Sequence, residues 1–166
     1  MIITKDTKKP ALIRNAECKA CGNCCRHGAG IVLPNEIPRL ANHMRMSKQK
    51  FIDKYLVETD LFHTNVHKFK QEKNSDLPSG SCVFFSNGKC KIHLVKPLFC
   101  KITTCASHGD EAVIWYYLNY LVNPDDPQSI REWAQHLTVG RNIPGGELKD
   151  LVPDRSKLKN MLDYKI

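Results

Sequence analysis

Cysteines are the residues of this chain that are best suited to chemistry, and they form two groups of four. The first group lies within eight residues and the second within twenty-four, as follows: Cys18, Cys21, Cys24 and Cys25; Cys82, Cys90, Cys100 and Cys105. Thiolates are soft ligands that bind zinc and iron. Clustered cysteines in a reducing compartment usually hold metal, whereas disulfides persist in secreted proteins. The pattern therefore predicts metal coordination by these eight cysteines.

The compartment decides between metal and disulfide, and the sequence favours a reducing one. The N-terminal residues 1–6 lack the basic run, apolar core and cleavage site of a signal peptide. No apolar stretch approaches the length of a membrane span. We therefore expect a cytoplasmic protein without membrane insertion, in which the cysteines are reduced.

The first cysteine group indicates iron more than zinc. Three cysteines at two-residue separations resemble the iron–sulfur run C-x₂-C-x₂-C, whereas a zinc ribbon has two distant C-x₂-C pairs. Gly22 follows the second cysteine, and it can adopt a backbone angle that lets N–H groups point at sulfur. A redox switch would need a thioredoxin-like βαβ context, which is absent. The sequence predicts an iron–sulfur cluster, [4Fe–4S] in type, with zinc as the alternative.

Adjacent cysteines cannot easily aim at one centre, so the two groups should share ligands. Cys24 and Cys25 are neighbours, and one of them could serve a second metal or join Cys82 and Cys90 across the fold. His27, near Cys25, could be a ligand or donate to a sulfur, and His93 and His108 flank the second group, but a role outside the metal site is favoured for each of them. The other four histidines have no ligand spacing: His43, His63, His67 and His136. No phosphate loop, nucleophile elbow or carboxylate pair is present, so catalytic residues are unknown.

The net positive charge of the chain is weaker evidence for nucleic-acid binding than its value suggests. The formal net charge is +8. Each filled four-thiolate site subtracts about two charges, which leaves roughly +4 if two sites are filled. The aromatic run with Trp115 and Tyr116 could stack on bases, but such a run is more often core. Nucleic-acid binding is therefore possible but not favoured, and we expect an unknown protein partner.

The elements that position the cysteines predict an α+β fold. We expect a small, irregular, cysteine-rich core with a β-hairpin, surrounded by several helices. We expect one domain, 1–166, with a metal-binding core at 17–105 and a helical C-terminal extension at 106–166.

Periodicity and turn residues give the individual elements. We expect Ser47 to cap a helix and Asn87-Gly88 to form the tight turn of a hairpin that brings Cys82 near Cys90. The remaining expectations are an extended segment at 11–13, a strand at 31–33, a helix from Pro34, an irregular loop with one strand at 58–81, a short helix or loop around Cys100 and Cys105, and helices at 112–122, 129–137 and 154–163.

The order of these motifs over residues 17–102 resembles the YkgJ-like C-x-x-C-x-x-C-C family of zinc- or iron-chelating domains. The resemblance rests on Cys18-x-x-Cys21-Gly22-x-Cys24-Cys25, on the Cys82 to His93 block, and on Lys96-Pro97-Leu98-x-Cys100-Lys101. It implies a metal or iron–sulfur centre. The family pattern has no counterpart of Cys105, for which an added ligand role is plausible. One branch resembles flagellin lysine N-methylase, but no motif for a methyl donor is present here.

Three function classes follow from these observations. The first is a cluster-binding protein in a redox, maturation or accessory role. The second is a cluster-dependent enzyme, such as a component of a protein-modifying methylase. The third is a zinc-stabilised module that docks on RNA or a protein complex. An accessible cluster edge favours the second class, and salt-dependent RNA binding favours the third.

Overall fold

A computed structural model describes residues 1–15, 18–28, 30–74, 77–105 and 107–166, which form two compact units. The cysteine unit comprises Ala16–Thr59 and Val66–Cys105, and it contains all eight cysteines. The helical unit comprises Met1–Asn15, Asp60–Asn65 and Ala106–Ile166. Helices and small antiparallel sheets are both present, so the predicted α+β class is confirmed. Within the described residues, no helix has the length and apolar character that crossing a membrane requires.

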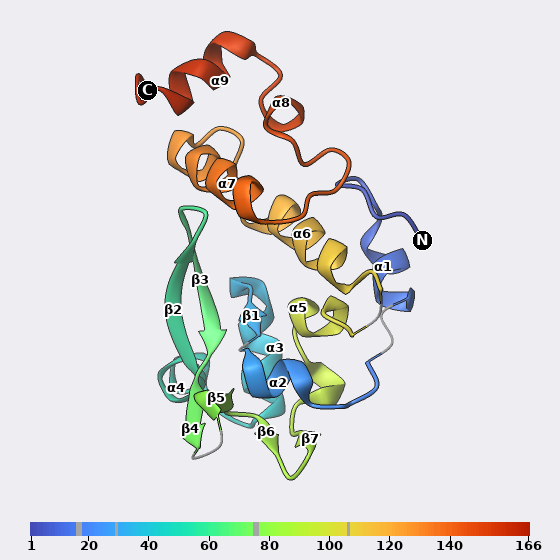
Figure 1. The fold of residues 1–166 in the computed structure, drawn as a ribbon. Helices are drawn as coiled ribbons and strands as arrows, with labels where there is room; N and C mark the ends of the chain where they lie inside the picture. The colour runs from blue at the N-terminus through green and yellow to red at the C-terminus, as the bar shows by residue number, and fades with distance from the viewer. Residues whose placement is uncertain (16–17, 29, 75–76, 106) are drawn as a thin grey trace. The chain divides into compact units, whose positions relative to one another are not determined.

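The helical unit consists mainly of the helices that precede and follow the cysteine segments (Figure 1). They are α1 (Lys9–Asn15), α6 (Gly109–Tyr120), α7 (Pro127–Val139), α8 (Leu148–Leu151) and α9 (Arg155–Leu162). The helices predicted at 112–122, 129–137 and 154–163 are confirmed as α6, α7 and α9. Trp115 and Tyr116 are buried in α6, as expected of core residues.

The extended segment predicted at 11–13 is wrong, because these residues lie in α1. Pro10 occupies the first turn of this helix, where its missing N–H costs no hydrogen bond. The N–H groups of Ala11 and Leu12 are both directed at the carbonyl of Lys8. Leu12 is 1% exposed, so burial of one apolar side chain on the helix outweighs the local tendency toward extended backbone.

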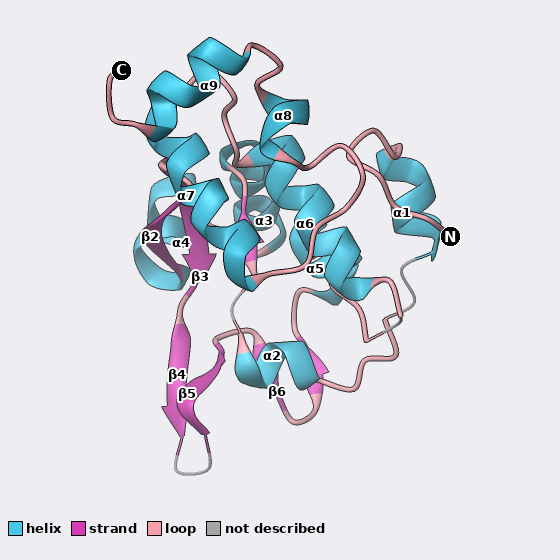
Figure 2. Ribbon diagram, turned by 45° about the horizontal axis from the view of Figure 1, so that its top comes forward, coloured by secondary structure: helices cyan, strands magenta, loops and turns pink. Residues whose placement is uncertain are grey.

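The cysteine unit contains short helices and strands (Figure 2). Its helical elements are α2 (Asn23–His27), η1 (Pro34–Glu36), α3 (Ile37–His43), α4 (Lys48–Tyr55), η2 (His93–Val95) and α5 (Leu98–Ile102). Its strands are β1 (Ile31–Val32), β4 (Gln71–Asn74), β5 (Leu77–Cys82), β6 (Phe85–Ser86) and β7 (Lys89–Cys90), together with most of β2 (Leu56–Leu61) and β3 (Thr64–Phe69). The predicted helix cap is confirmed, because the Ser47 side chain accepts from the Lys50 N–H at 3.3 Å.

The irregular loop predicted at 58–81 is wrong. Most of this segment lies in β2, β3, β4 and β5. The first sheet has the strand order β1-β3-β2, and β1 pairs antiparallel with β3, with Ile31 opposite Lys68. The strands were hard to see in the sequence because they are polar, and the turn between β2 and β3 uses Phe62 and His63 at positive φ rather than glycine.

The hairpin predicted over residues 82–92 is confirmed around its turn, but Cys82, expected in its first strand, lies in β5 opposite Gln71 of β4. In β6 and β7, Phe85 is opposite Cys90 and Ser86 is opposite Lys89. Asn87 and Gly88 both have positive φ, as a type I′ turn requires. Cys82 ends β5 just before this hairpin, and Cys90 lies in its second strand.

An apolar core fills the cysteine unit beside these strands. Its rings include Phe69 and Phe84, whose centroids lie 5.2 Å apart in an edge-to-face arrangement. The buried members are Val32, Ile37, Leu40, Ala41, Phe51, Leu56, Phe69, Cys82, Phe84 and Ile92. Cys82 is therefore both a core residue and a candidate ligand.

Candidate metal centre

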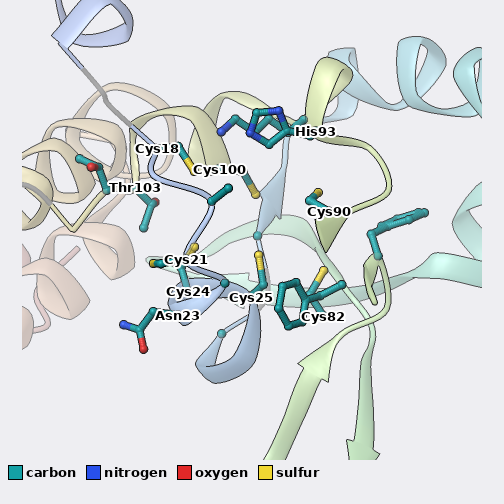
Figure 3. Close-up of a pocket in the computed structure, with 18 of the residues that line it drawn as sticks. Cys18, Cys21, Asn23, Cys24, Cys25, Cys82, Cys90, His93, Cys100 and Thr103 are labelled. Carbon is teal, nitrogen blue, oxygen red and sulfur yellow. The ribbon is translucent and has the colours of Figure 1, made fainter. Parts of the chain in front are cut away.

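All eight cysteines line one pocket of the cysteine unit, with a volume of about 500 Å³ (Figure 3). The pocket brings together the two sequence groups, which are separated by more than fifty residues in the chain. Its other lining residues include Lys19, Lys96, Phe69 and Phe85. Sequence reasoning named the cysteines but did not place Phe69 and Phe85 at the pocket. Phe85 lies in the apolar run after Cys82, whereas Phe69 had no such signal.

Four cysteines form an inner group, defined here as Cys25, Cys82, Cys90 and Cys100. Cys82 belongs to the apolar core, and the other three pack against it. None of the four is exposed. In Figure 3 their side chains point toward the same part of the pocket. One of them comes from the first sequence group and three come from the second, so the folded chain mixes the two groups.

The other four cysteines form an outer group, defined here as Cys18, Cys21, Cys24 and Cys105, and all four are exposed. The Sγ atoms of Cys21 and Cys105 lie 3.7 Å apart, although 84 residues separate them in the chain. Cys105 follows α5 in an irregular segment, as expected. The outer group again combines three cysteines from one sequence group with one from the other.

Backbone N–H groups hydrogen-bond to several of the sulfurs. The donors are two residues further along the chain: Asn23 for Cys21, Phe84 for Cys82 and Ile92 for Cys90. Such donors stabilise a thiolate and are typical of the tight turns that hold metal-binding cysteines. Cys90 lies in β7 of the hairpin, and Cys82 ends β5 just before it.

Two glycines shape the backbone where it lines the pocket. Gly22 has a φ of +75°, and a Cβ placed there would lie 2.4 Å from the ring of Phe85. This confirms the unusual backbone angle expected of Gly22. Gly30 packs against Cys100, since a Cβ at Gly30 would lie 2.2 Å from its Sγ. Both glycines therefore allow the chain to approach the pocket closely.

Glu36 holds the helix that carries Cys100. Its carboxylate accepts the Leu98 N–H at 2.7 Å and the Leu33 N–H at 3.1 Å. These two hydrogen bonds connect the end of β1 to the first residue of α5. Because Cys100 lies in the first turn of α5, Glu36 is a positioning residue for the inner group.

The thiols of the pocket differ in acidity. A hydrogen bond from Cys25 lowers the pKa of Cys24 to about 6. Burial raises the pKa of Cys82 to about 11, and it also raises the pKa values of Cys90 and Cys100. Proteins reverse such shifts by supplying positive charge, and a metal ion is the strongest such charge. The thiols of the inner group therefore do not readily lose their protons until a cation binds among them.

The donor set fits a soft metal. None of the described residues that line the pocket is acidic, which disfavours magnesium and calcium. The histidines among them are His27 and His93, and both are exposed. His108 lies at the start of α6 in the helical unit. In the described part of the chain, no three cysteine, histidine or acidic side chains already converge on a single-ion site.

Comparison with protein-family models gives one match, over residues 17–119, to the CxxCxxCC family, described as a "Putative zinc- or iron-chelating domain". The chain belongs to this family. The matched region contains all eight cysteines, including Cys105. No curated protein and no solved structure matches the chain. As a CxxCxxCC domain, the protein is a metal-binding cysteine domain for zinc or iron.

Proposed function

We propose that this CxxCxxCC protein holds an iron–sulfur cluster of the [4Fe–4S] type and acts in electron transfer or in a redox accessory step. The observation that carries the proposal is the single pocket lined by all eight cysteines. Ligands are drawn from this set, and the inner group, Cys25, Cys82, Cys90 and Cys100, has the arrangement best suited to the cluster.

Space in the pocket supports a cluster over a lone zinc ion. Four thiolates around one zinc at about 2.3 Å lie about 3.8 Å from one another, and no cavity remains between them. The described residues show no set of three ligands that converges in this way. The inner sulfurs instead surround part of a cavity of about 500 Å³. A multi-atom cluster suits sulfurs that face one another across a space.

The surroundings suit a negatively charged cluster near the surface. Lys96 lines the pocket, and its positive charge acts on Cys24, Cys90 and Cys100. Four thiolates outweigh the core charge of a four-iron cluster by about two, so a nearby cation stabilises the filled site. The outer cysteines are exposed, which gives an electron donor or acceptor access to the pocket. The cytoplasm, as a reducing compartment, would keep such thiols available.

The test is metal and acid-labile sulfide analysis of protein purified without oxygen, together with its visible spectrum. We expect brown protein with iron and sulfide in near-equal amounts, and bleaching by dithionite that air reverses. Cys90→Ser should lose most of the sulfide, whereas His43→Ala, at an exposed residue of α3 outside the pocket, should retain it. Colourless protein with stoichiometric zinc and no sulfide would overturn the proposal.

A further inference from the structure

We propose that the surface around the cysteine pocket binds an acidic protein of the electron-carrier class, with Leu94 as an apolar anchor among basic side chains. The proposal rests on the proposed function, which requires a partner that gives or takes electrons at this pocket. Two observations carry it. One is the charge of the segments that build the pocket, and the other is the exposure of Leu94 between two lining residues.

Positive charge is concentrated in the segments that build the pocket. Apart from Phe69, the described lining residues come from 18–30 and 82–105. Neither segment contains an aspartate or a glutamate, so the 17 acidic residues of the chain lie elsewhere. Most of the net charge of +8 therefore comes from these two segments. Their six lysines and arginines are defined here as the basic border: Lys19, Arg26, Lys89, Lys91, Lys96 and Lys101.

The cations of the basic border are available to a partner. Lys19, Arg26, Lys89 and Lys91 are exposed. None of the ion pairs between described residues uses a cation of this border. The guanidinium of Arg26 lies 5.4 Å from the ring centroid of Phe85, which lines the pocket, so its charge is held beside the pocket.

The positive character remains when the site is filled. A four-iron cluster with its four thiolates carries about two negative charges, which leaves the two segments with roughly +4. Lys96 is near enough to act on Cys24, Cys90 and Cys100. The negative charge of Glu72, on β4, acts on Cys82, which is buried. A partner that approaches the exposed cysteines therefore meets a basic surface.

Leu94 supplies an apolar contact within this surface. It is 88% exposed in η2, and its neighbours His93 and Lys96 both line the pocket. A single exposed apolar side chain is common, but this one lies inside the basic border. Protein interfaces combine apolar contacts with a polar and charged rim, and those of electron-transfer complexes are small. One apolar anchor with a basic border fits such a weak, short-lived complex.

Nucleic acid is the competing partner for a basic surface. Proteins that bind single strands usually present aromatic rings on which the bases stack. Among the described residues, the exposed large apolar side chains of the cysteine unit are Val57 and Leu94, and neither is aromatic. Phe85 is half-buried, and Arg26 lies over its ring. The surface offers charge without a stacking platform, which favours an acidic protein.

The experiment measures binding rather than electron transfer, so that the result does not depend on the type of metal centre. Electrostatic attraction depends on charge more than on the identity of the carrier. Oxidised flavodoxin, an acidic carrier, is therefore the probe, and cytochrome c, a basic carrier, is its control. Isothermal titration calorimetry of anaerobic full-length protein gives each Kd. Flavodoxin binding should weaken about tenfold or more between 10 and 100 mM salt, over which the Debye length falls from about 30 to about 10 Å. Cytochrome c should not bind.

Charge reversal at two sites separates local charge from net charge. Lys19→Glu/Lys89→Glu should weaken flavodoxin binding about tenfold at 10 mM salt and remove most of its salt dependence. Lys48→Glu/Lys50→Glu changes the net charge equally, at exposed residues of α4 that do not line the pocket, and should cost less than about threefold. Iron and sulfide analysis checks that each variant keeps its centre. If the first variant loses iron, Lys19→Gln/Lys89→Gln repeats the test with an expected loss of about threefold.

Leu94→Ala tests the apolar anchor separately. It should weaken flavodoxin binding by about 3–10-fold at both salt concentrations, because the lost contact is apolar and is not screened. Its thermal stability should equal that of wild type, since Leu94 is 88% exposed in the free protein.

Four results would overturn the docking surface. The first is brown, iron-loaded protein that does not bind flavodoxin at 10 mM salt. The second is equal weakening in the two charge-reversed variants, and the third is wild-type affinity in Leu94→Ala. The fourth is a 20-nucleotide uridine RNA that binds more tightly than flavodoxin at 100 mM salt, which would assign the surface to RNA. Colourless zinc protein that binds flavodoxin with the expected salt dependence would instead overturn only the proposed function.

Discussion

The cores of the helical unit and the cysteine unit are held together by different kinds of interaction. In the helical unit, Trp133 and Ile130 are fully buried, and the indole N–H of Trp133 donates to the Gly146 carbonyl at 2.8 Å. The rings of Phe62 and Trp133 meet with their centroids 5.3 Å apart. Around Trp133, this core is therefore held by apolar and ring contacts and by a hydrogen bond between buried groups.

In the cysteine unit, by contrast, cysteine side chains pack against one side of the apolar core. Phe69, Phe84 and Ile92 are buried, and beyond them lie the sulfurs of the inner group. A neutral thiol behaves as a small apolar group, whereas a metal requires the thiolate. The stability of this unit should therefore depend on what the sulfurs bind, while the stability of the helical unit should not. The following predictions test this contrast, from the largest expected effect to the smallest.

Metal removal should have the largest effect, and it should be confined to the cysteine unit. Bound structural zinc contributes roughly 10–16 kcal/mol in small domains that fold only with metal, so a loss of several kcal/mol is expected here. Amide hydrogen exchange at Phe84 and Ile92 should rise by orders of magnitude after anaerobic chelation. Both tryptophans, Trp115 and Trp133, lie in the helical unit, so their fluorescence should change little. An equal rise in amide exchange in both units would contradict the idea that only the cysteine unit depends on bound metal.

Gly30→Ala should damage the metal centre without changing a ligand. A Cβ at Gly30 would lie 2.2 Å from Cys100 Sγ and 3.4 Å from the Phe69 ring. Overpacking of this kind typically costs about 1–3 kcal/mol, and metal binding should weaken by about 10–100-fold because a ligand is displaced. Metal content and thermal unfolding check both effects.

Gly28→Ala is the matched control for this substitution. It lies two residues earlier in the same loop, and the nearest atom to its added Cβ is the Cys24 carbonyl oxygen at 3.5 Å. That distance is an ordinary contact, so this variant should bind metal as wild type does. Equal metal loss in the two variants would show that flexibility of the loop, rather than its contact with Cys100, governs the site.

The sequence was sufficient for those parts of the cysteine unit where one residue type dictates the local geometry. Asn87-Gly88 predicted the hairpin because a type I′ turn needs two residues at positive φ. Ser47 predicted the start of α4 because its hydroxyl can accept a free N–H. The cysteine spacing predicted metal chemistry, and the family match agrees with zinc or iron.

The rest depended on contacts between distant residues. Phe62 and His63 form a turn without glycine or asparagine, so the hairpin of β2 and β3 had no local signal. Glu36 accepts from Leu98, sixty-two residues away, and nothing near Glu36 in the chain indicates this. The division into inner and outer cysteines depends on which sulfurs reach the apolar core. Spacing along the chain does not contain that information.

Trp133→Phe should destabilise the helical unit and leave metal binding unchanged. The smaller ring loses packing and leaves the Gly146 carbonyl without the indole donor that it has in a buried position. Loss of a partner for a buried polar group costs about 1–3 kcal/mol. Chemical denaturation followed by circular dichroism should show this loss, while metal content stays at the wild-type level. Val139→Ala in the same helix is the control, because Val139 is 88% exposed and should change stability by less than about 0.5 kcal/mol. Metal loss in Trp133→Phe would contradict the idea that metal binding is independent of the helical unit.

The smallest effect should be the pH response of His63 in the helical unit. A hydrogen bond and the negative charge of Asp126 raise the pKa of His63 above its ordinary value. Asp126→Asn should lower that pKa, which NMR titration of the His63 ring can measure. Asparagine keeps the cap of α7, where the Asp126 side chain accepts from the Gln128 N–H, because it is as good a capping residue as aspartate.

The sign of the effect on stability follows from the direction of this pKa shift. A group whose pKa is higher in the folded state stabilises the fold when it is protonated. The contribution of His63 is therefore fully present below the unfolded pKa of about 6.5, and it is lost as the pH rises through the folded value. The stability difference between wild-type and Asp126→Asn protein should shrink over that interval. Metal content should stay constant across it, since His63 belongs to the helical unit and the cysteines do not. A His63 pKa that is the same in both proteins would mean that the pair with Asp126 does not form in solution.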